Sequence, residues 1–111
     1  MSNYQIDRTR WAQLDILNQM GNIGSEVGRA IAAKRRGDSE RFEGALGRAL
    51  DLFDATQEAL VEAKSPRFKE VRRARDQFLS LFFGDSFERT ADNIERYFMQ
   101  FATAARMRQT T

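Results

Sequence analysis

Apolar side chains recur at helical spacing along the whole chain. Near the C-terminus, steps of four and three residues form an unbroken heptad pattern through Phe87, Ala91, Ile94, Phe98, Phe101 and Ala105. A second run has the same spacing and contains Phe42, Ala45, Leu46, Ala49, Leu50, Phe53, Ala59, Leu60 and Ala63. No segment alternates as a β-strand does, and β-branched residues are sparse. The pattern therefore predicts an all-α protein.

Turn-forming residues divide the chain at three places. Gly37 and Gly84 are placed to end helices, and Ser65–Pro66 is placed to begin one. These divisions predict four helices, at about residues 7–36, 39–64, 66–83 and 86–108. Short connections between long amphipathic helices favour an antiparallel up-down four-helix bundle. With 111 residues, the chain is expected to form a single domain spanning residues 1–111.

Glycines gather on one face of the first predicted helix. Each glycine inside a helix costs roughly 0.5–1 kcal/mol relative to alanine, so a structural reason for them is expected. Gly21, Gly24 and Gly28 share this face, and Gly28 would lie opposite Gly47 in an antiparallel pair. Bare positions let two helix backbones approach closely. We predict a tight crossing of the first two helices; the alternative is a hinge or break near Gly21–Asn22.

The composition argues against an enzyme. The chain has no cysteine and no histidine, which removes thiol nucleophiles, Cys/His zinc sites and imidazole acid–base catalysis. No serine, lysine or carboxylate spacing suggests another nucleophilic system. The acids beside the glycine-rich face, Asp15 and Glu26, are expected to be solvated or paired with Arg29 and Arg48. We therefore expect no catalytic residue, no metal and no cofactor.

Hydropathy indicates a protein of the cell interior. The N-terminal stretch lacks the apolar core of a signal peptide, and no apolar run approaches the roughly 20 residues that span a bilayer. We expect a cytoplasmic protein with no membrane partner.

Basic residues form two clusters, although the net charge of the chain is only +2. Fifteen of the eighteen basic residues are arginines. Arginine suits bidentate phosphate contacts, while a GC-rich genome would enrich it without functional meaning. The candidate nucleic-acid-binding residues are Lys34, Arg35 and Arg36 at the end of the first helix, and Lys64, Arg67, Lys69, Arg72 and Arg73 around the start of the third. The first cluster complements a helix dipole, but the second lies where cations are slightly unfavourable. The second cluster is therefore interpreted as a phosphate-binding face, with an ordinary solvated face as the alternative.

Aromatic residues exceed what one bundle core needs. Nine Phe, two Tyr and one Trp are present, and Phe82, Phe83 and Tyr97 extend the apolar surface beyond one helix face. A helix that is apolar on two sides is either deeply buried or meets a partner. We predict self-association through the third and fourth helices, where Arg75 is a candidate interface residue.

The stretch Asn22-Ile23-Gly24-Ser25-Glu26 resembles the Asn-Ile-Ala-Glu-Gly stretch of the family of the ribosomal RNA intervening-sequence protein. The helix with Phe42, Ala45-Leu46 and Ala49-Leu50 also resembles a helix of this family. The accessory variability protein of diversity-generating retroelements is similar to the same family. The resemblance implies a four-helix bundle that forms a ring-like homo-oligomer. In the retroelement branch it implies binding to a reverse transcriptase and its template RNA. The Arg-x4-His motif of the broader HEPN ribonucleases cannot exist here without histidine.

The sequence thus favours a non-catalytic accessory protein that homo-oligomerises and binds RNA or a ribonucleoprotein through arginines. The alternative is a protein–protein interaction module, of adaptor or antitoxin type, in which the arginines are merely solvated.

Overall fold

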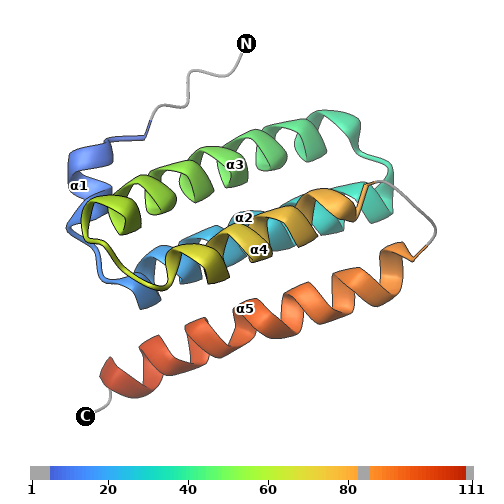
Figure 1. The fold of residues 1–111 in the computed structure, drawn as a ribbon. Helices are drawn as coiled ribbons and strands as arrows, with labels where there is room; N and C mark the ends of the chain where they lie inside the picture. The colour runs from blue at the N-terminus through green and yellow to red at the C-terminus, as the bar shows by residue number, and fades with distance from the viewer. Residues whose placement is uncertain (1–5, 83–85, 110–111) are drawn as a thin grey trace.

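The computed structural model describes residues 6–82 and 86–109, and helices account for most of them (Figure 1). The five helices are α1 (Arg8–Ala12), α2 (Ile16–Arg36), α3 (Ser39–Glu62), α4 (Phe68–Ser80) and α5 (Phe87–Gln109). No strand occurs within the described residues, so the predicted all-α class is confirmed. In the same part of the chain, no helix is both long enough and apolar enough to cross a membrane.

The predicted first helix is in fact two helices, α1 and α2, separated at residues 13–15. Asp15 caps α2, because its carboxylate accepts a hydrogen bond from the backbone N–H of Asn18. The break leaves carbonyl groups without helical partners, and the buried amide of Gln19 donates to two of them, those of Trp11 and Leu14. Both earlier expectations, a continuous helix over 7–36 and a break near Gly21–Asn22, are therefore wrong.

The short helix α1 is fixed to α3 by one buried side-chain pair. The indole Nε1 of Trp11 donates to Thr56 Oγ1 at 2.8 Å, and both residues are buried. This bond satisfies two polar groups that would otherwise be buried without partners. Trp11 thereby closes one end of the core.

The connection between α2 and α3 follows the prediction. Gly37 ends α2 in the left-handed conformation (φ 73°), and the Asp38 carboxylate caps α3 by accepting from Arg41 N–H. The next connection differs, since α4 begins at Phe68 and not at residue 66. Ser65 Oγ accepts from Arg67 N–H, and residues 66–67 form a turn before the helix. α4 also ends at Ser80, earlier than the predicted residue 83, and the predicted stop at Gly84 lies outside the described residues.

The four long helices enclose one core. α2 packs against α3 and α5, and α4 also packs against α3 and α5. Phe53 of α3 lies at the centre, where its ring centroid is 6.1 Å from that of Phe78 in α4 and 6.2 Å from that of Phe98 in α5. All three aromatic rings are buried, so one residue of α3 joins the packing of two other helices.

The glycines do not produce the predicted crossing of α2 and α3. A Cβ on Gly24 would lie 2.9 Å from Cβ of Phe98, so the close approach is between α2 and α5. A Cβ on Gly28 or Gly47 would meet no atom within 4 Å, and Gly47 is exposed. The expectation that Gly28 and Gly47 face each other is therefore wrong. The bare position that matters is Gly24, which accommodates a phenylalanine.

Two glycine-to-alanine substitutions should have opposite effects on stability. Gly47→Ala should raise the free energy of unfolding by about 0.5–1 kcal/mol, because alanine is the better helix former and has room there. Gly24→Ala should lower it by about 1–3 kcal/mol, because the added methyl overlaps Phe98 near its backbone. Urea denaturation of both variants tests this. Equal gains at both positions would contradict the close packing of α2 on α5.

Candidate nucleic-acid interface

The basic residues of α4 lie on its solvent side. Val71, Ala74 and Phe78 are buried at helical spacing, which turns the positions between them outward. Lys69, Arg72 and Arg73 occupy outward positions and are exposed. The apolar spacing of this helix thus determines where its charges point.

Two further cations precede the helix. Lys64 and Arg67 are exposed in the connection from α3, and Lys64 adopts a left-handed backbone conformation (φ 54°). We call Lys64, Arg67, Lys69, Arg72 and Arg73 the basic face. None of the five forms an ion pair with an acid in residues 6–82 or 86–109. Their charges are therefore available to an external anion.

A side-chain hydrogen bond links α5 to α4 beside the basic face. The Tyr97 hydroxyl donates to Glu70 Oε1 of α4 at 2.9 Å. Burial raises the pKa of the Tyr97 phenol above its ordinary value, and the bond to Glu70 raises it further. The phenol therefore remains a donor at neutral pH.

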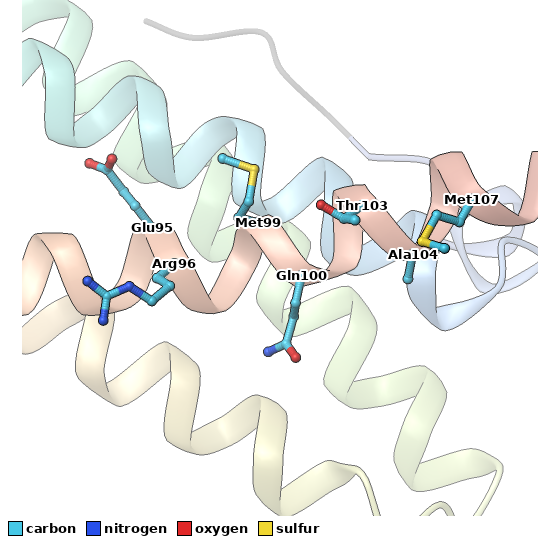
Figure 2. Close-up of a pocket in the computed structure, with 7 residues that line it drawn as sticks. All are labelled: Glu95, Arg96, Met99, Gln100, Thr103, Ala104 and Met107. Carbon is cyan, nitrogen blue, oxygen red and sulfur yellow. The ribbon is translucent and has the colours of Figure 1, made fainter.

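Arg96 is a neighbour of the basic face that sequence reasoning missed. Figure 2 shows Arg96 and Gln100 pointing to the α4 side of α5, whereas Glu95 and Met99 point toward α2. Arg96 is exposed and makes no ion pair with the acids that the structure describes. The sequence offered one clue to the position of Arg96, because Arg96 precedes Tyr97, the α5 residue that donates a hydrogen bond to α4.

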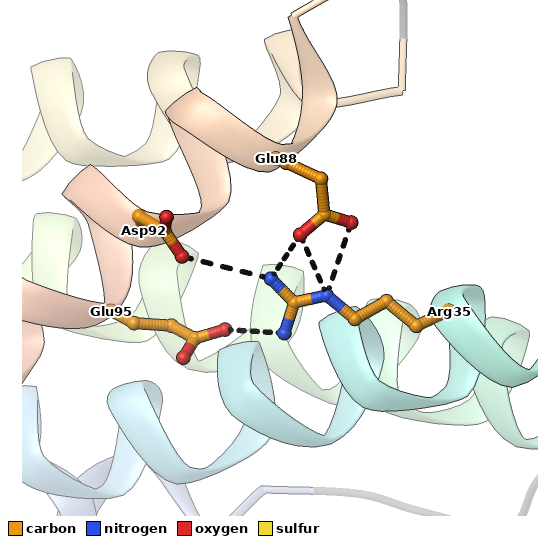
Figure 3. A network of polar contacts seen from close by, with 4 residues as sticks. All are labelled: Arg35, Glu88, Asp92 and Glu95. Atoms are coloured by element: carbon orange, nitrogen blue, oxygen red, sulfur yellow. Dashed lines mark hydrogen bonds and ion pairs between the residues drawn. The ribbon is translucent and has the colours of Figure 1, made fainter.

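The other predicted cluster, Lys34–Arg36, is partly used inside the protein. Arg35 of α2 reaches three carboxylates of α5, with its guanidinium nitrogens 2.7 Å from Glu88, 3.4 Å from Glu95 and 3.8 Å from Asp92 (Figure 3). The hydrogen bonds from Arg35 hold the pKa of the Glu88 carboxyl below its usual range. Arg35 thus links α2 to α5, and its charge is already compensated.

The flanking members of this cluster differ from each other. Lys34 Nζ lies 5.3 Å from the centre of the Phe42 ring, a cation–π contact at the start of α3. Arg36 is exposed and has no ion pair among the described residues. Of the three residues, only Arg36 therefore has a charge that is free to contact an external anion, as the basic face does.

The two acids beside the glycine-rich face are both paired, Glu26 with the expected arginines and Asp15 with a different one. Glu26 lies 2.7 Å from Arg29 and 2.9 Å from Arg48, so it joins α2 to α3. Asp15 pairs with Arg108 of α5. These carboxylates are structural partners of arginines.

The aromatic surface expected for self-association is largely internal. Phe82 is half-buried, and its ring lies 4.8 Å from Phe42 and 5.5 Å from Phe78. Tyr97 is half-buried against the rings of Phe98 and Phe101. Neither supplies the exposed apolar surface predicted for it, because both rings complete the core.

Of the remaining two candidates for that interface, the structure describes only Arg75. Arg75 lies 3.5 Å from Asp54 of α3 and thus bridges two helices of the same chain. Phe83 lies outside the described residues.

Removing the Arg35 guanidinium should destabilise the protein in a pH-dependent way. The lowered pKa of Glu88 means that its stabilising effect is complete above the unfolded-state value, near 4.5, and is lost as pH falls through the folded-state value. The difference in unfolding free energy between wild type and Arg35→Gln should therefore shrink from neutral pH to about pH 2. Urea denaturation across this range measures it, with Arg89→Gln as the control, because Arg89 is exposed on α5 and forms no ion pair with the acids of residues 6–82 and 86–109. A pH-independent difference would contradict the ion-pair assignment.

Comparisons with known proteins give no match: no family model, no curated protein and no solved structure is significantly similar to this chain. The resemblance to the intervening-sequence family stays a prediction. The geometry of the basic face is therefore the best guide to what this protein does.

Proposed function

We propose that this protein is a non-catalytic accessory protein that homo-oligomerises and binds RNA, or a ribonucleoprotein, through the basic face. The observation that carries the proposal is five exposed cations, clustered before and within the first turns of α4, without acidic partners in the described chain. The proposal includes an antiparallel up-down four-helix bundle acting in the cytoplasm. A reverse transcriptase complex is the ribonucleoprotein that the family resemblance suggests.

Intramolecular electrostatics do not account for the basic face. The N-terminus of α4 carries the positive end of its dipole, so cations there slightly destabilise the helix. The one acid in its first turn, Glu70, accepts the Tyr97 hydroxyl. In contrast, Arg35 stands at a helix C-terminus opposite three acids, where both the dipole and its neighbours favour it. A phosphate backbone would supply the missing negative charge.

The face is suited to phosphate contacts more than to base recognition. Its side chains are exposed, whereas the aromatic residues within and beside it, Phe68 and Tyr97, are half-buried against the core. Stacking of bases requires an accessible aromatic face, whereas arginine and lysine contact phosphates independently of sequence. We therefore expect binding that depends strongly on salt and weakly on base sequence.

Reversing two charges on the basic face should abolish most RNA binding. Arg72→Glu/Arg73→Glu should weaken binding of a short fluorescent single-stranded RNA by about tenfold or more. Loss of two phosphate contacts should also reduce the slope of log K against log salt by about 1.4. Fluorescence anisotropy at several salt concentrations measures both quantities. Circular dichroism verifies the fold, which should persist because both side chains are exposed.

A matched pair of charge reversals provides the control. Arg36→Glu/Arg41→Glu changes the net charge equally at the α2–α3 connection and should bind RNA with a smaller loss. If this variant loses binding and the α4 variant does not, the basic face is the wrong surface. Wild-type protein that ignores RNA would instead favour the protein–protein interaction module.

A further inference from the structure

A groove lies between α2 and α5 and adjoins a shallow hollow along the exposed side of α5. One part, of about 340 Å³, is lined by residues of both helices, including Gly21, Gly28, Met99 and Ala102. The adjoining part, of about 570 Å³, continues along α5 past Met99 and Thr103 to Met107 (Figure 2). Met99 is 59% exposed and Met107 is 65% exposed, which is unusual for large apolar side chains.

The floor of this groove is open at two glycines. A Cβ on Gly21 or Gly28 would meet no atom within 4 Å, in contrast to Gly24, which is filled by Phe98. The side chains of residues 6–82 and 86–109 therefore leave space over α2 beside an exposed methionine. A protruding side chain, Met99, and a recess over Gly21 and Gly28 thus occur together on one surface, as a self-complementary interface requires.

The charges along the same face of α5 are segregated. Steps of four and three residues place Glu88, Asp92, Glu95, Met99, Ala102 and Arg106 on one stripe. The N-terminal half of this stripe has three carboxylates against one guanidinium, that of Arg35. Arg106 at the other end is exposed and has no ion pair with the described acids. The stripe is acidic at one end, apolar in the middle and basic at the other.

We propose that this face pairs with the same face of a second copy of the chain, with the two α5 helices antiparallel about a two-fold axis. An axis crossing α5 between residues 100 and 101 sets Met99 opposite Ala102 of the other copy. The same register sets Glu95 opposite Arg106. Apolar contact at the centre and opposite charges at both ends then occur in one arrangement.

The available area is sufficient for a dimer. In this register residues 92–109 of the two α5 helices overlap; these 18 residues span about 27 Å at 1.5 Å per residue, and two adjacent helices are about 20 Å across. The overlapping face therefore offers about 540 Å² per subunit, or about 1,100 Å² in total, above the roughly 1,000 Å² that a specific interface needs. This inference rests on the self-association within the proposed function, and it is independent of RNA binding.

The apolar centre is tested by Met99→Asp, measured by sedimentation equilibrium. The dimer dissociation constant should rise about tenfold or more, because a charge replaces a central apolar contact. Val61→Asp is the matched control, since Val61 is 57% exposed on α3 and should leave the dimer intact. A Cβ on Gly28 meets no atom of the described chain within 4 Å, so the side chain of Gly28→Leu should project into the recess and weaken the dimer similarly.

The register is tested at Arg106, which faces Glu95 of the other copy. Arg106→Glu should weaken the dimer by placing like charges opposite each other, whereas Arg106→Lys, which keeps the positive charge, should preserve it. An oligomer that is unaffected by Met99→Asp and by Arg106→Glu would overturn this face while leaving self-association intact. A strictly monomeric wild type would overturn both this face and the proposed self-association. RNA binding measured on the same samples tests the basic face independently.

Discussion

The contact of Phe98 with Gly24 sets the spacing of α2 and α5, on which much of the structure depends. Only a residue without a side chain lets the phenylalanine reach this depth, where its ring meets Phe53 at the centre of the core. The same approach brings Arg35 within reach of the carboxylates of α5. It also leaves the flanking glycine positions as a groove. One packing contact thus connects the core, the ion-pair cluster and an exposed surface.

The arginines of this chain separate into two groups by their surroundings. Arg35, Arg48 and Arg75 each face carboxylates on a neighbouring helix, so their charges hold the helices together. Arg72 and Arg73 face solvent without such partners. The total charge of +2 conceals this division, because it counts paired and unpaired cations alike. A weakly charged protein can therefore present a locally basic surface.

The helical class and most helix ends were predictable, because they depend on local rules: apolar spacing, and turn residues such as Gly37. The break before Asp15 was missed because Trp11, Leu14 and Leu17 continue a helical spacing across it. The break became evident only from the hydrogen bond of Trp11 to Thr56 and from those of Gln19 to backbone carbonyls near the break. Likewise, periodicity placed Gly24 on a face but did not identify α5 as its neighbour. The exposure of α4 cations followed from spacing alone, whereas the pairing of Arg35 required the tertiary arrangement.

Asp15 has two partners that lie far apart in the sequence. Its carboxylate caps the first turn of α2 and also pairs with Arg108 in the last turn of α5. Helix ends normally fray independently, and their amide hydrogens exchange quickly. Here the shared carboxylate couples the opening of one end to that of the other. Slow exchange of the Asn18 amide hydrogen would then indicate that the C-terminal turn is ordered. Removing that turn would speed amide exchange at the beginning of a helix more than 70 residues earlier.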